Sequence, residues 1–307
     1  MSTVAVIAHA GKSIGGGLPE LRRTLARNGV GDPLWVEVPK SRKAPKQVKR
    51  LLAQGADQFF IWGGDGMVQR CIDALEGAEA TVAIVPSGTA NLLATNLGIP
   101  KDIDGAVAIG LHGRLRRIDV AAMNGERFAV MAGVGFDADM IAGADGRLKE
   151  RLGRAAYLWT GTKSFRAEPF TAKIRVDGNP WFSGTASCIL AGNVGALFGG
   201  VHVFTDAEPD DGLLDLAVIT AEGVAQWWGT VGRTITGGLE ASPHCRVTRG
   251  HKVKVKLDRK VLYEIDGGAR TKVKAYRLAI DPGAIAIRVP EATTNGGGRH
   301  EQHSGTR

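Results

Sequence analysis

The sequence predicts an N-terminal α/β domain with a parallel sheet, followed by a mostly antiparallel β-sandwich domain. Short apolar runs alternate with amphipathic helical patterns over the first ~120 residues, as in βα units. From about Glu126 onward, strand-like segments dominate instead. The length of 307 residues also exceeds what one hydrophobic core usually serves. We therefore expect an α/β domain over 1–125, completed by part of 281–292, a β-rich domain over 126–280, and a disordered polar tail over 293–307.

Strands and helices alternate regularly in the first part. Four apolar runs predict strands at 4–8, 34–38, 58–62 and 81–85. Segments with helical spacing that each close on a glycine predict helices over 18–29, 45–55, 67–77 and 89–98. Folds of this kind bind ligands at the carboxyl ends of their strands. Three glycine-bearing loops stand at such ends: HAGKSIGGG, GGDG and PSGT.

The second part is predicted to be mainly β-structure. Strand-like segments occupy 127–133, 170–176, 187–192, 213–219, 253–257, 277–280 and 284–289. The pairs Asp177–Gly178 and Asn179–Pro180 are typical of turns between strands. Two helical patterns, at 147–165 and 223–236, interrupt the strands.

The composition favours a globular protein over a membrane-spanning or disulfide-rich one. With 44% hydrophobic and 23% charged residues the chain is ordinary for a globular protein. It has neither a membrane-spanning run nor a signal peptide, so we expect a cytoplasmic protein. Three scattered cysteines suggest no disulfide framework and no zinc site. The net charge of +8 favours anionic partners, but no aromatic-basic motif supports nucleic-acid binding.

The GGDG stretch, Gly63 to Gly66, stands between a predicted strand and a predicted helix. A helix N-terminus presents free N–H groups and partial positive charge, and glycines let a phosphate approach that backbone closely. A carboxylate facing a phosphate would be repelled, so Asp65 fits a bridging Mg²⁺ better. The sequence therefore predicts a site for phosphate and Mg²⁺, and a tight turn without a ligand is the alternative.

Two other loops imitate nucleotide motifs. HAGKSIGGG ends like a P-loop, but the first glycine of that motif would fall on Val6, which excludes Walker A. Lys12 remains a candidate phosphate contact, with a plain surface loop as the alternative. GVGFDA, residues 133–138, imitates a dinucleotide fingerprint without the βαβ unit that the fingerprint requires, so NAD binding is not expected.

Charged segments offer further candidates. EPDDGLLDL, residues 208–216, has oxygen donors that suit a hard divalent cation, and a solvated acidic turn is equally open. The basic run 40–50 is explained most simply as a solvated helix face. In HKVKVKL, residues 251–257, every second residue is a lysine, which predicts one cationic strand face that could meet an anionic membrane or simply water. Trp227 and Trp228 could anchor at an interface or pack in a core.

With GGDG at a strand end and PSGTANLLATNLGIP about twenty residues later, the chain resembles the diacylglycerol kinase catalytic-domain family, particularly its soluble bacterial lipid kinases. The likeness runs from VAVIAHAGK to PGAIAIRVP. NAD kinases share GGDG and the general architecture, but their asparagine-glutamate motif is missing here. The resemblance implies an NAD kinase/diacylglycerol kinase-like fold that uses ATP and Mg²⁺ to phosphorylate the hydroxyl of a lipid such as diacylglycerol. A cytoplasmic protein with such an acceptor would work at the membrane surface.

The resemblance also places roles on residues. It implies a nucleotide site built from Gly63, Gly64, Asp65, Gly66, Met67, Val68 and Gln69, with Gly88, Thr89 and Asn91 as further contacts. Asp65 would organise Mg-ATP, and Asp266 would orient or deprotonate the acceptor hydroxyl. Asp119 and Asp137 are similar to acidic positions near the cleft between the domains. The acidic turn resembles a structural Mg²⁺ site, with ligands from Glu208, Asp211, the carbonyl of Leu213, and Asp119.

Four positions depart from the family pattern. Met67 stands where threonine is usual, Leu92 where an aspartate is usual, and Pro39 where a threonine is often found. The Asp-Gly-Glu that the family carries near its C-terminus reads Asp266-Gly267-Gly268, so the glutamate expected to deprotonate the lipid hydroxyl is absent. General base assistance is worth ~10² to 10⁴-fold, so its loss would slow the enzyme without abolishing transfer.

These departures keep several alternatives open. Asp266 or Glu264 could replace the missing glutamate as the base. A kinase acting on NAD or on a sphingoid base, and a catalytically weakened protein that binds nucleotide or lipid, are the competing hypotheses. A homodimer through an edge strand is also compatible with the sequence.

Overall fold

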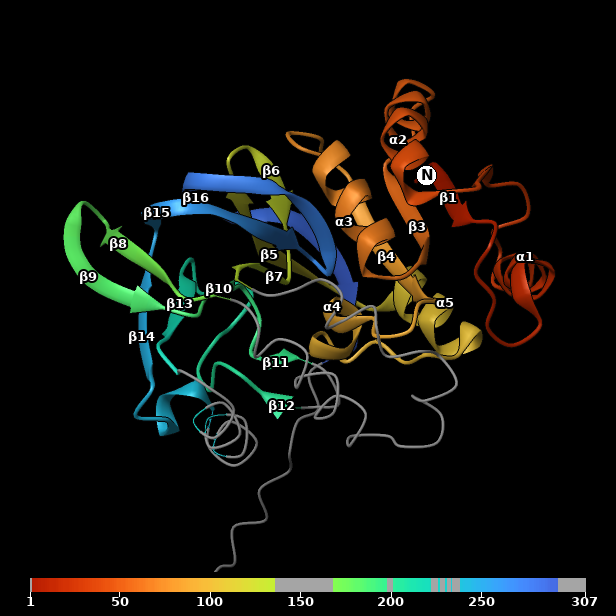
Figure 1. Cartoon of the computed structure of the whole chain (residues 1–307). Helices are drawn as coiled ribbons and strands as arrows, with labels where there is room; N and C mark the ends of the chain where they lie inside the picture. Colours follow the sequence, from red (N-terminus) through yellow and green to blue (C-terminus); the bar gives the residue numbers. More distant parts are fainter. Residues whose placement is uncertain are drawn as a thin grey trace, which may run out of the picture.

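The computed structural model describes residues 2–135, 168–197, 201–221 and 238–291, together with the single residues 226, 230 and 233 (Figure 1). The sequence-predicted helical patterns at 147–165 and 223–236 therefore fall almost entirely outside the described residues, as do Asp137, Trp227 and Trp228. No helix within the described ranges is long and apolar enough to cross a membrane.

The N-terminal part is an α/β unit whose strands lie in the order β2-β1-β3-β4, all parallel. Apolar residues make β3 completely buried, as expected for a strand covered on both faces. Figure 1 shows the helices packed around this sheet. The elements are β1 (Val4–His9), α1 (Gly17–Arg27), β2 (Leu34–Val38), η1 (Ser41–Lys43), α2 (Ala44–Ala53), β3 (Gln58–Gly63), α3 (Asp65–Ala74), β4 (Thr81–Pro86), α4 (Leu92–Asn96) and α5 (Ile103–His112).

The C-terminal part is built mainly from antiparallel strands. Alternating burial along β8 and the first half of β15 shows that one sheet face packs on a core while the other is exposed. The elements are β5 (Arg114–Met123), β6 (Glu126–Phe128), β7 (Met131–Val134), β8 (Phe170–Val176), β9 (Asn179–Ala186), β10 (Cys188–Gly192), β11 (Ala196–Leu197), β12 (Val201–His202), β13 (Leu214–Ile219), η3 (Leu239–Ala241), β14 (Cys245–Gly250), β15 (Lys252–Ile265) and β16 (Gly268–Val289).

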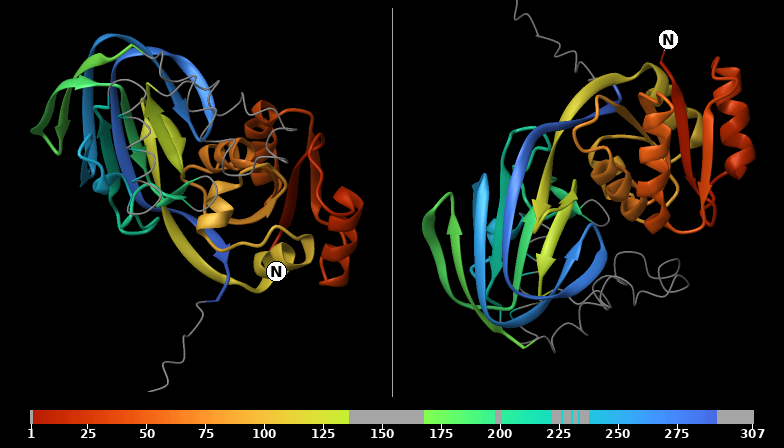
Figure 2. Two further views of the ribbon diagram at one scale, coloured as in Figure 1. Left: turned by 60° about the horizontal axis from the view of Figure 1, so that its bottom comes forward. Right: turned by 90° about the horizontal axis from the view of Figure 1, so that it is seen from above.

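One long strand joins the two parts into a continuous sheet. β16 pairs with β15 over its first half, then pairs in parallel with β4 through Ala286 and Ile287. β5 runs antiparallel to β16 across the junction, with a register shift between Asp281 and Ile285. The two views in Figure 2 show β16 passing from the β-rich part to the edge of the α/β sheet. Residues far apart in sequence thus meet where the two parts join.

The fold class predicted from the sequence is confirmed, and the four parallel strands lie within one residue of their expected bounds. Several elements were missed: α5, β5, β9 and β14 were not predicted, and 277–280 and 284–289 belong to the single strand β16. Asn179–Pro180 begins β9 and is not a turn, because the reversal is already complete at Asp177 and Gly178, which both have positive φ. The predicted division into domains at residue 125 stays a prediction.

Candidate functional site

Three loops gather at the carboxyl ends of β1, β3 and β4. The Trp62 indole at the end of β3 donates to the carbonyl of Lys12 at 3.1 Å, which ties the loop after β1 to β3. The backbone N–H of Ser87 donates to the carbonyl of Gly63 at 3.0 Å, which ties the loop after β4 to the same strand end. The structure thus brings the three predicted loops together, with the side chains of Lys12 and Thr89 exposed.

The glycines of these loops have two different physical roles. A Cβ on Gly88 would lie 2.4 Å from the Cα of Gly64, and a Cβ on Gly63 would lie 2.4 Å from the Cβ of Met67. These three glycines are therefore required for close packing between loops and helix. Gly66 differs, because it is exposed and a Cβ there would meet nothing within 4 Å. Gly66 is the position where the bare backbone faces open space at the start of α3.

Asp65, the first residue of α3, points toward the start of the next helix. Its carboxylate accepts a hydrogen bond from the backbone N–H of Leu93 in α4, at 3.3 Å. Burial raises the pKa of Asp65, although hydrogen bonds from backbone N–H groups around the start of α4 oppose that shift. Leu92, where the family usually has an aspartate, is a buried apolar neighbour of these amides. The carboxylate is thus held in a fixed place by α4.

Asn91 shapes the loop after β4. It adopts positive φ (52°), a conformation that asparagine tolerates better than most residues. Its side chain accepts a hydrogen bond from the N–H of Gly88 at 2.9 Å and donates to the carbonyl of the same residue at 2.8 Å. Asn91 is 4% exposed, so its amide group holds the loop and its contact with a ligand stays a prediction.

The remaining predicted nucleotide contacts on α3 have buried side chains. Met67 and Val68 belong to the larger hydrophobic core, which contains residues of both parts, and this explains why an apolar residue is compatible with position 67. Gln69 donates to the carbonyl of Arg127 in β6 at 2.6 Å. In turn, Arg127 pairs with Asp281 of β16 at 2.8 Å. Any contact of residues 67–69 with a phosphate would therefore use backbone N–H groups, while Gln69 connects α3 to the β-rich part.

Asp266 lies in the turn between β15 and β16, at positive φ (44°), and is 6% exposed. Its carboxylate accepts hydrogen bonds from the backbone N–H groups of Ala129, Val130 and Met131, at 3.2, 3.1 and 2.8 Å. The pKa of Asp266 is raised to about 7, mainly by burial; the charge of Asp65 adds to this rise, and the three hydrogen bonds oppose it. The charge of Asp65 thus influences Asp266 across the junction of the two parts.

The space beside Gly268 is filled by an arginine. A Cβ on Gly268 would lie 2.6 Å from Nη1 of Arg270, and that nitrogen donates to the carbonyl of Gly268 at 2.8 Å. Both carboxylate oxygens of Glu126 accept from Nε of Arg270, at 2.9 and 2.8 Å. The guanidinium of Arg270 lowers the pKa of Glu126. An arginine-glutamate pair therefore borders the turn where the family has its glutamate, and no sequence motif indicated this pair.

The predicted metal ligands lie in and around the acidic turn, but other groups already engage them. The carboxylate of Asp119 accepts from the N–H groups of Gly212 and Gly283, both at 2.7 Å. Glu208 pairs with Arg116 at 3.2 Å, and the Oδ1 of Asp211 accepts from the N–H of Leu213 at 2.9 Å. Burial raises the pKa of Asp119.

This donor set holds together without a cation. Among the described residues no cluster of three or more His, Cys, Asp or Glu is arranged to hold a metal ion. We therefore derive no chemistry from this turn, and a structural Mg²⁺ there stays a prediction.

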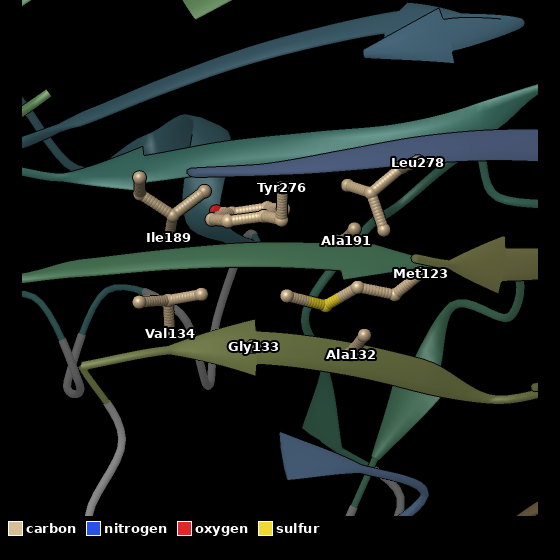
Figure 3. Close-up of a pocket in the computed structure, with 8 residues that line it drawn as sticks. All are labelled: Met123, Ala132, Gly133, Val134, Ile189, Ala191, Tyr276 and Leu278. Atoms are coloured by element: carbon tan, nitrogen blue, oxygen red, sulfur yellow. The ribbon is translucent and has the colours of Figure 1, made fainter. Parts of the chain in front are cut away.

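A narrow apolar gap, too small to admit a water molecule, lies inside the β-rich part (Figure 3). It is lined by Met123, Ala132, Gly133, Val134, Ile189, Ala191, Tyr276 and Leu278. The hydroxyl of Tyr276 is buried and finds no hydrogen-bond partner among the residues that the structure describes. Burial raises the pKa of Tyr276 well above its usual value, so the hydroxyl is neutral. The gap is therefore part of the hydrophobic core of the β-rich part, and it leaves no room for a ligand.

Comparisons with known proteins agree with this architecture. Residues 4–123 match the family model "Diacylglycerol kinase catalytic domain", and residues 129–289 match "YegS C-terminal NAD kinase beta sandwich-like domain". A "Probable lipid kinase YegS-like" from Pseudomonas aeruginosa is 32% identical over 301 residues, covering 94% of both chains. A protein of the same name from Cronobacter sakazakii is 30% identical over 274 residues, covering 85% of this chain and 87% of its own.

Solved structures show the same fold. A diacylglycerol kinase from Bacillus anthracis aligns with a TM-score of 0.76 at 22% identity, covering 95% of this chain and 98% of its own. An NAD kinase from Archaeoglobus fulgidus, solved in complex with ATP, aligns with a TM-score of 0.53 at 12% identity over 94% of both chains. From the two family models and from relatives that align along nearly its whole length, the chain belongs to the YegS-like family of the diacylglycerol kinase catalytic-domain proteins.

Proposed function

We propose that the protein is an ATP-dependent lipid kinase that transfers the γ-phosphate to a lipid hydroxyl. The observation that carries the proposal is the gathering of three loops at the carboxyl ends of β1, β3 and β4, where the bare backbone of Gly66 faces open space at the start of α3. The family supports kinase chemistry, since its relatives are named lipid kinases and diacylglycerol kinases.

The nucleotide would bind at the start of α3. The first turn of a helix leaves N–H groups without partners inside the helix, and its partial positive charge favours a phosphate. Gly66 gives the phosphates room to approach, and the exposed Lys12 can reach over from the neighbouring loop. A Mg²⁺ ion held by Asp65 would neutralise charge that develops on the transferred group. Asp65 suits this task because its carboxylate is fixed by the N–H of Leu93.

The acceptor hydroxyl would be oriented from the β-rich part. Asp266, with a pKa of about 7, exchanges its proton near neutral pH and can accept the proton of an attacking hydroxyl. Its three backbone hydrogen bonds fix its position. Glu264 lies on β15 and is 5% exposed, and it pairs across the sheet with Gly133. Asp266 is therefore the better placed of the two candidate bases, because it is the one coupled to Asp65.

The acyl part of the acceptor needs apolar surface. Diacylglycerol, a sphingoid base, ceramide and phosphatidylglycerol all combine an acyl or alkyl chain with a free hydroxyl, so they form the panel to be tested.

The test is transfer of radiolabelled phosphate from Mg-ATP to this panel in detergent micelles. We expect the wild-type protein to label at least one lipid and the Asp65→Asn variant to label none. Asp32→Asn is the matched control, because Asp32 is exposed and precedes β2, at the amino ends of the parallel strands, whereas the site lies at their carboxyl ends. Absence of labelling on every lipid, with a related kinase active in parallel, would refute the proposal. Equal labelling by the Asp65→Asn variant would refute the role of Asp65.

A second candidate is a protein that binds Mg-ATP and lipid without turnover. The observation that favours it is the filled space beside Gly268, where Arg270 stands in place of a catalytic carboxylate. Calorimetric binding of Mg-ATP with no labelled product would support this candidate. Restoring the family residue with Gly268→Glu, combined with Arg270→Ala to make room, would then be expected to create activity.

A further inference from the structure

The outer face of the sheet formed by β8, β15 and β16 carries a concentrated positive charge. Six exposed side chains form it, and we call them the cationic face: Lys173, Arg175, Lys252, Lys254, Lys256 and Arg277. The three strands lie side by side in both views of Figure 2. The cationic face therefore combines β8 with the hairpin of β15 and β16, which begins about 80 residues later in the sequence.

Strand register proves that these side chains share one face. Lys254 pairs with Arg175 of β8 on one side and with Arg277 of β16 on the other. Lys256 pairs with Lys173 in the next row. Residues directly opposite each other in neighbouring strands point to the same side of a sheet, and so do alternate residues along a strand. The apolar residues between them, such as Val253 and Val255, are buried on the inner side.

Basic residues outnumber the acids on and around this face, where Asp177 follows β8 and Asp258 lies two residues after Lys256 on β15. Residues 170–176, 252–257 and 271–280 contain eight lysines or arginines and no aspartate or glutamate. Within the described part of the chain, none of the six side chains takes part in an ion pair. The guanidinium of Arg175 binds only the backbone carbonyl of Gly178. Like charges in adjacent rows repel one another, so this arrangement lowers stability unless an anionic partner is bound.

We propose that the cationic face docks the protein on an anionic lipid surface. The choice of a lipid surface rests on the proposed function, because an acyl-chain substrate resides in a membrane. A bilayer rich in anionic headgroups presents a broad negative surface that matches six cations spread over three strands. Single-stranded nucleic acid is a poorer fit, because its binding sites use aromatic stacking. The aromatic residues in these segments, Phe170 and Tyr276, are buried on the inner side.

The cationic face and the candidate site are parts of one hairpin. Four of the six cations lie on β15 and β16, and the turn between these two strands holds Asp266. The strands are paired by hydrogen bonds along the hairpin, with irregular register near Val261. Docking through the cationic face would therefore hold the Asp266 turn at a fixed distance from the bilayer.

The test measures binding of the full chain to vesicles without ATP or substrate. Vesicles of phosphatidylcholine with 30% phosphatidylserine, which is not among the candidate acceptors, are compared with pure phosphatidylcholine by co-sedimentation at about 0.1 M salt, where charges act over about 10 Å. Each cation near an anionic surface contributes about five-fold in affinity. The variant with Lys252→Gln, Lys254→Gln and Lys256→Gln should therefore bind the anionic vesicles about 100-fold more weakly than wild type.

A matched control removes the same charge elsewhere. Lys46→Gln, Lys49→Gln and Arg50→Gln neutralise three exposed cations on α2, so both triple variants have the same net charge. We expect the α2 variant to bind anionic vesicles nearly as tightly as wild type. Equal losses in the two variants, or no preference of wild type for anionic vesicles, would overturn the proposal. If the β15 variant loses its circular dichroism spectrum, Lys173→Gln alone should still weaken binding about five-fold.

Two further readouts separate the possible outcomes. A DNA duplex that binds more tightly than the vesicles and displaces the protein from them would assign the cationic face to nucleic acid and overturn the proposal. Phosphate transfer in uncharged detergent micelles should be the same in wild type and in both triple variants. If micelle activity persists while vesicle binding is lacking, docking is refuted and the kinase proposal stands. If vesicle binding follows the cationic face while no lipid is phosphorylated, only the kinase proposal fails.

Discussion

Replacing Asp266 with asparagine removes the proton-binding group and keeps the shape of the side chain. The amide oxygen of asparagine can still accept from the N–H groups of Val130 and Met131. Because general base assistance is worth about 10² to 10⁴-fold, we expect phosphate transfer by the Asp266→Asn variant to fall by that factor. In the wild-type protein the rate should rise with pH around an apparent pKa of about 7, since the carboxylate must be deprotonated to accept the proton.

The same substitution has a consequence for stability. The folded pKa of Asp266 is about 7, against 3.8 for the free side chain, so the folded state holds a proton between these values that the unfolded chain has lost. The stabilisation is fully present below pH 3.8 and is lost as the pH rises to about 7. At about 1.4 kcal/mol per pH unit the full loss is about 4 kcal/mol, of which about 3 kcal/mol falls between pH 5 and 8. The Asp266→Asn variant, being neutral throughout, should not show this loss.

Urea unfolding of both proteins from pH 5 to pH 8 measures the difference. We expect the free energy of unfolding of wild type to fall relative to the variant by about 3 kcal/mol over this range. Parallel curves would show that Asp266 is ionised throughout and would refute the assigned pKa. A variant with undiminished phosphate transfer would refute the role as base, whatever its stability.

Three further predictions concern the neighbouring groups. In the Asp65→Asn variant, the loss of stability with rising pH should end at a lower pH than in wild type, because a charge that raises the pKa of Asp266 is gone. Urea unfolding at a series of pH values checks this. Gly66→Ala should weaken ATP binding in calorimetry and leave the melting temperature unchanged. By contrast, Gly88→Ala should lower the free energy of unfolding by about 1 to 3 kcal/mol, because its Cβ would overlap neighbouring backbone. Tyr276→Phe should raise the free energy of unfolding by about 1 to 3 kcal/mol in chemical denaturation, because it removes a buried hydroxyl without a partner in the described structure. A free energy of unfolding below that of wild type would show that the hydroxyl is bonded.

The parallel half of the fold was predictable because its signals are local. The apolar run ending at Trp62, the glycine at each helix end and the loops after the strands all lie within short windows of sequence. The β-rich half was harder to predict, because its strands pair across long separations. β16 contains two apolar stretches with Pro282 and Gly283 between them, and its continuity depends on pairing with β5 and β4. No short window of sequence contains that information.

In the candidate site, too, only the local features could be predicted from the sequence. Glycines near Asp65 signalled a special backbone, but the sequence could not separate Gly66, which faces open space, from Gly64 and Gly88, which pack on each other. The absence of a glutamate at position 268 was visible, yet the arginine that fills its space was not. Pairing of Arg270 with Glu126 joins residues 144 positions apart, so only the fold reveals it.

The continuous strand β16 also limits how the molecule can move. Rotation of one part against the other would bend both β16 and β5 and break hydrogen bonds between them. The softest point is the irregular stretch between Asp281 and Ile285, where Gly283 has φ of +60°. Even there, the carboxylate of Asp119 binds the N–H groups of both Gly283 and Gly212, which clamps this stretch to the acidic turn. We therefore expect the two parts to keep a fixed relative orientation while substrates enter through local movement of loops. The hydrogen bonds of Asp119 would limit bending at the irregular stretch of β16.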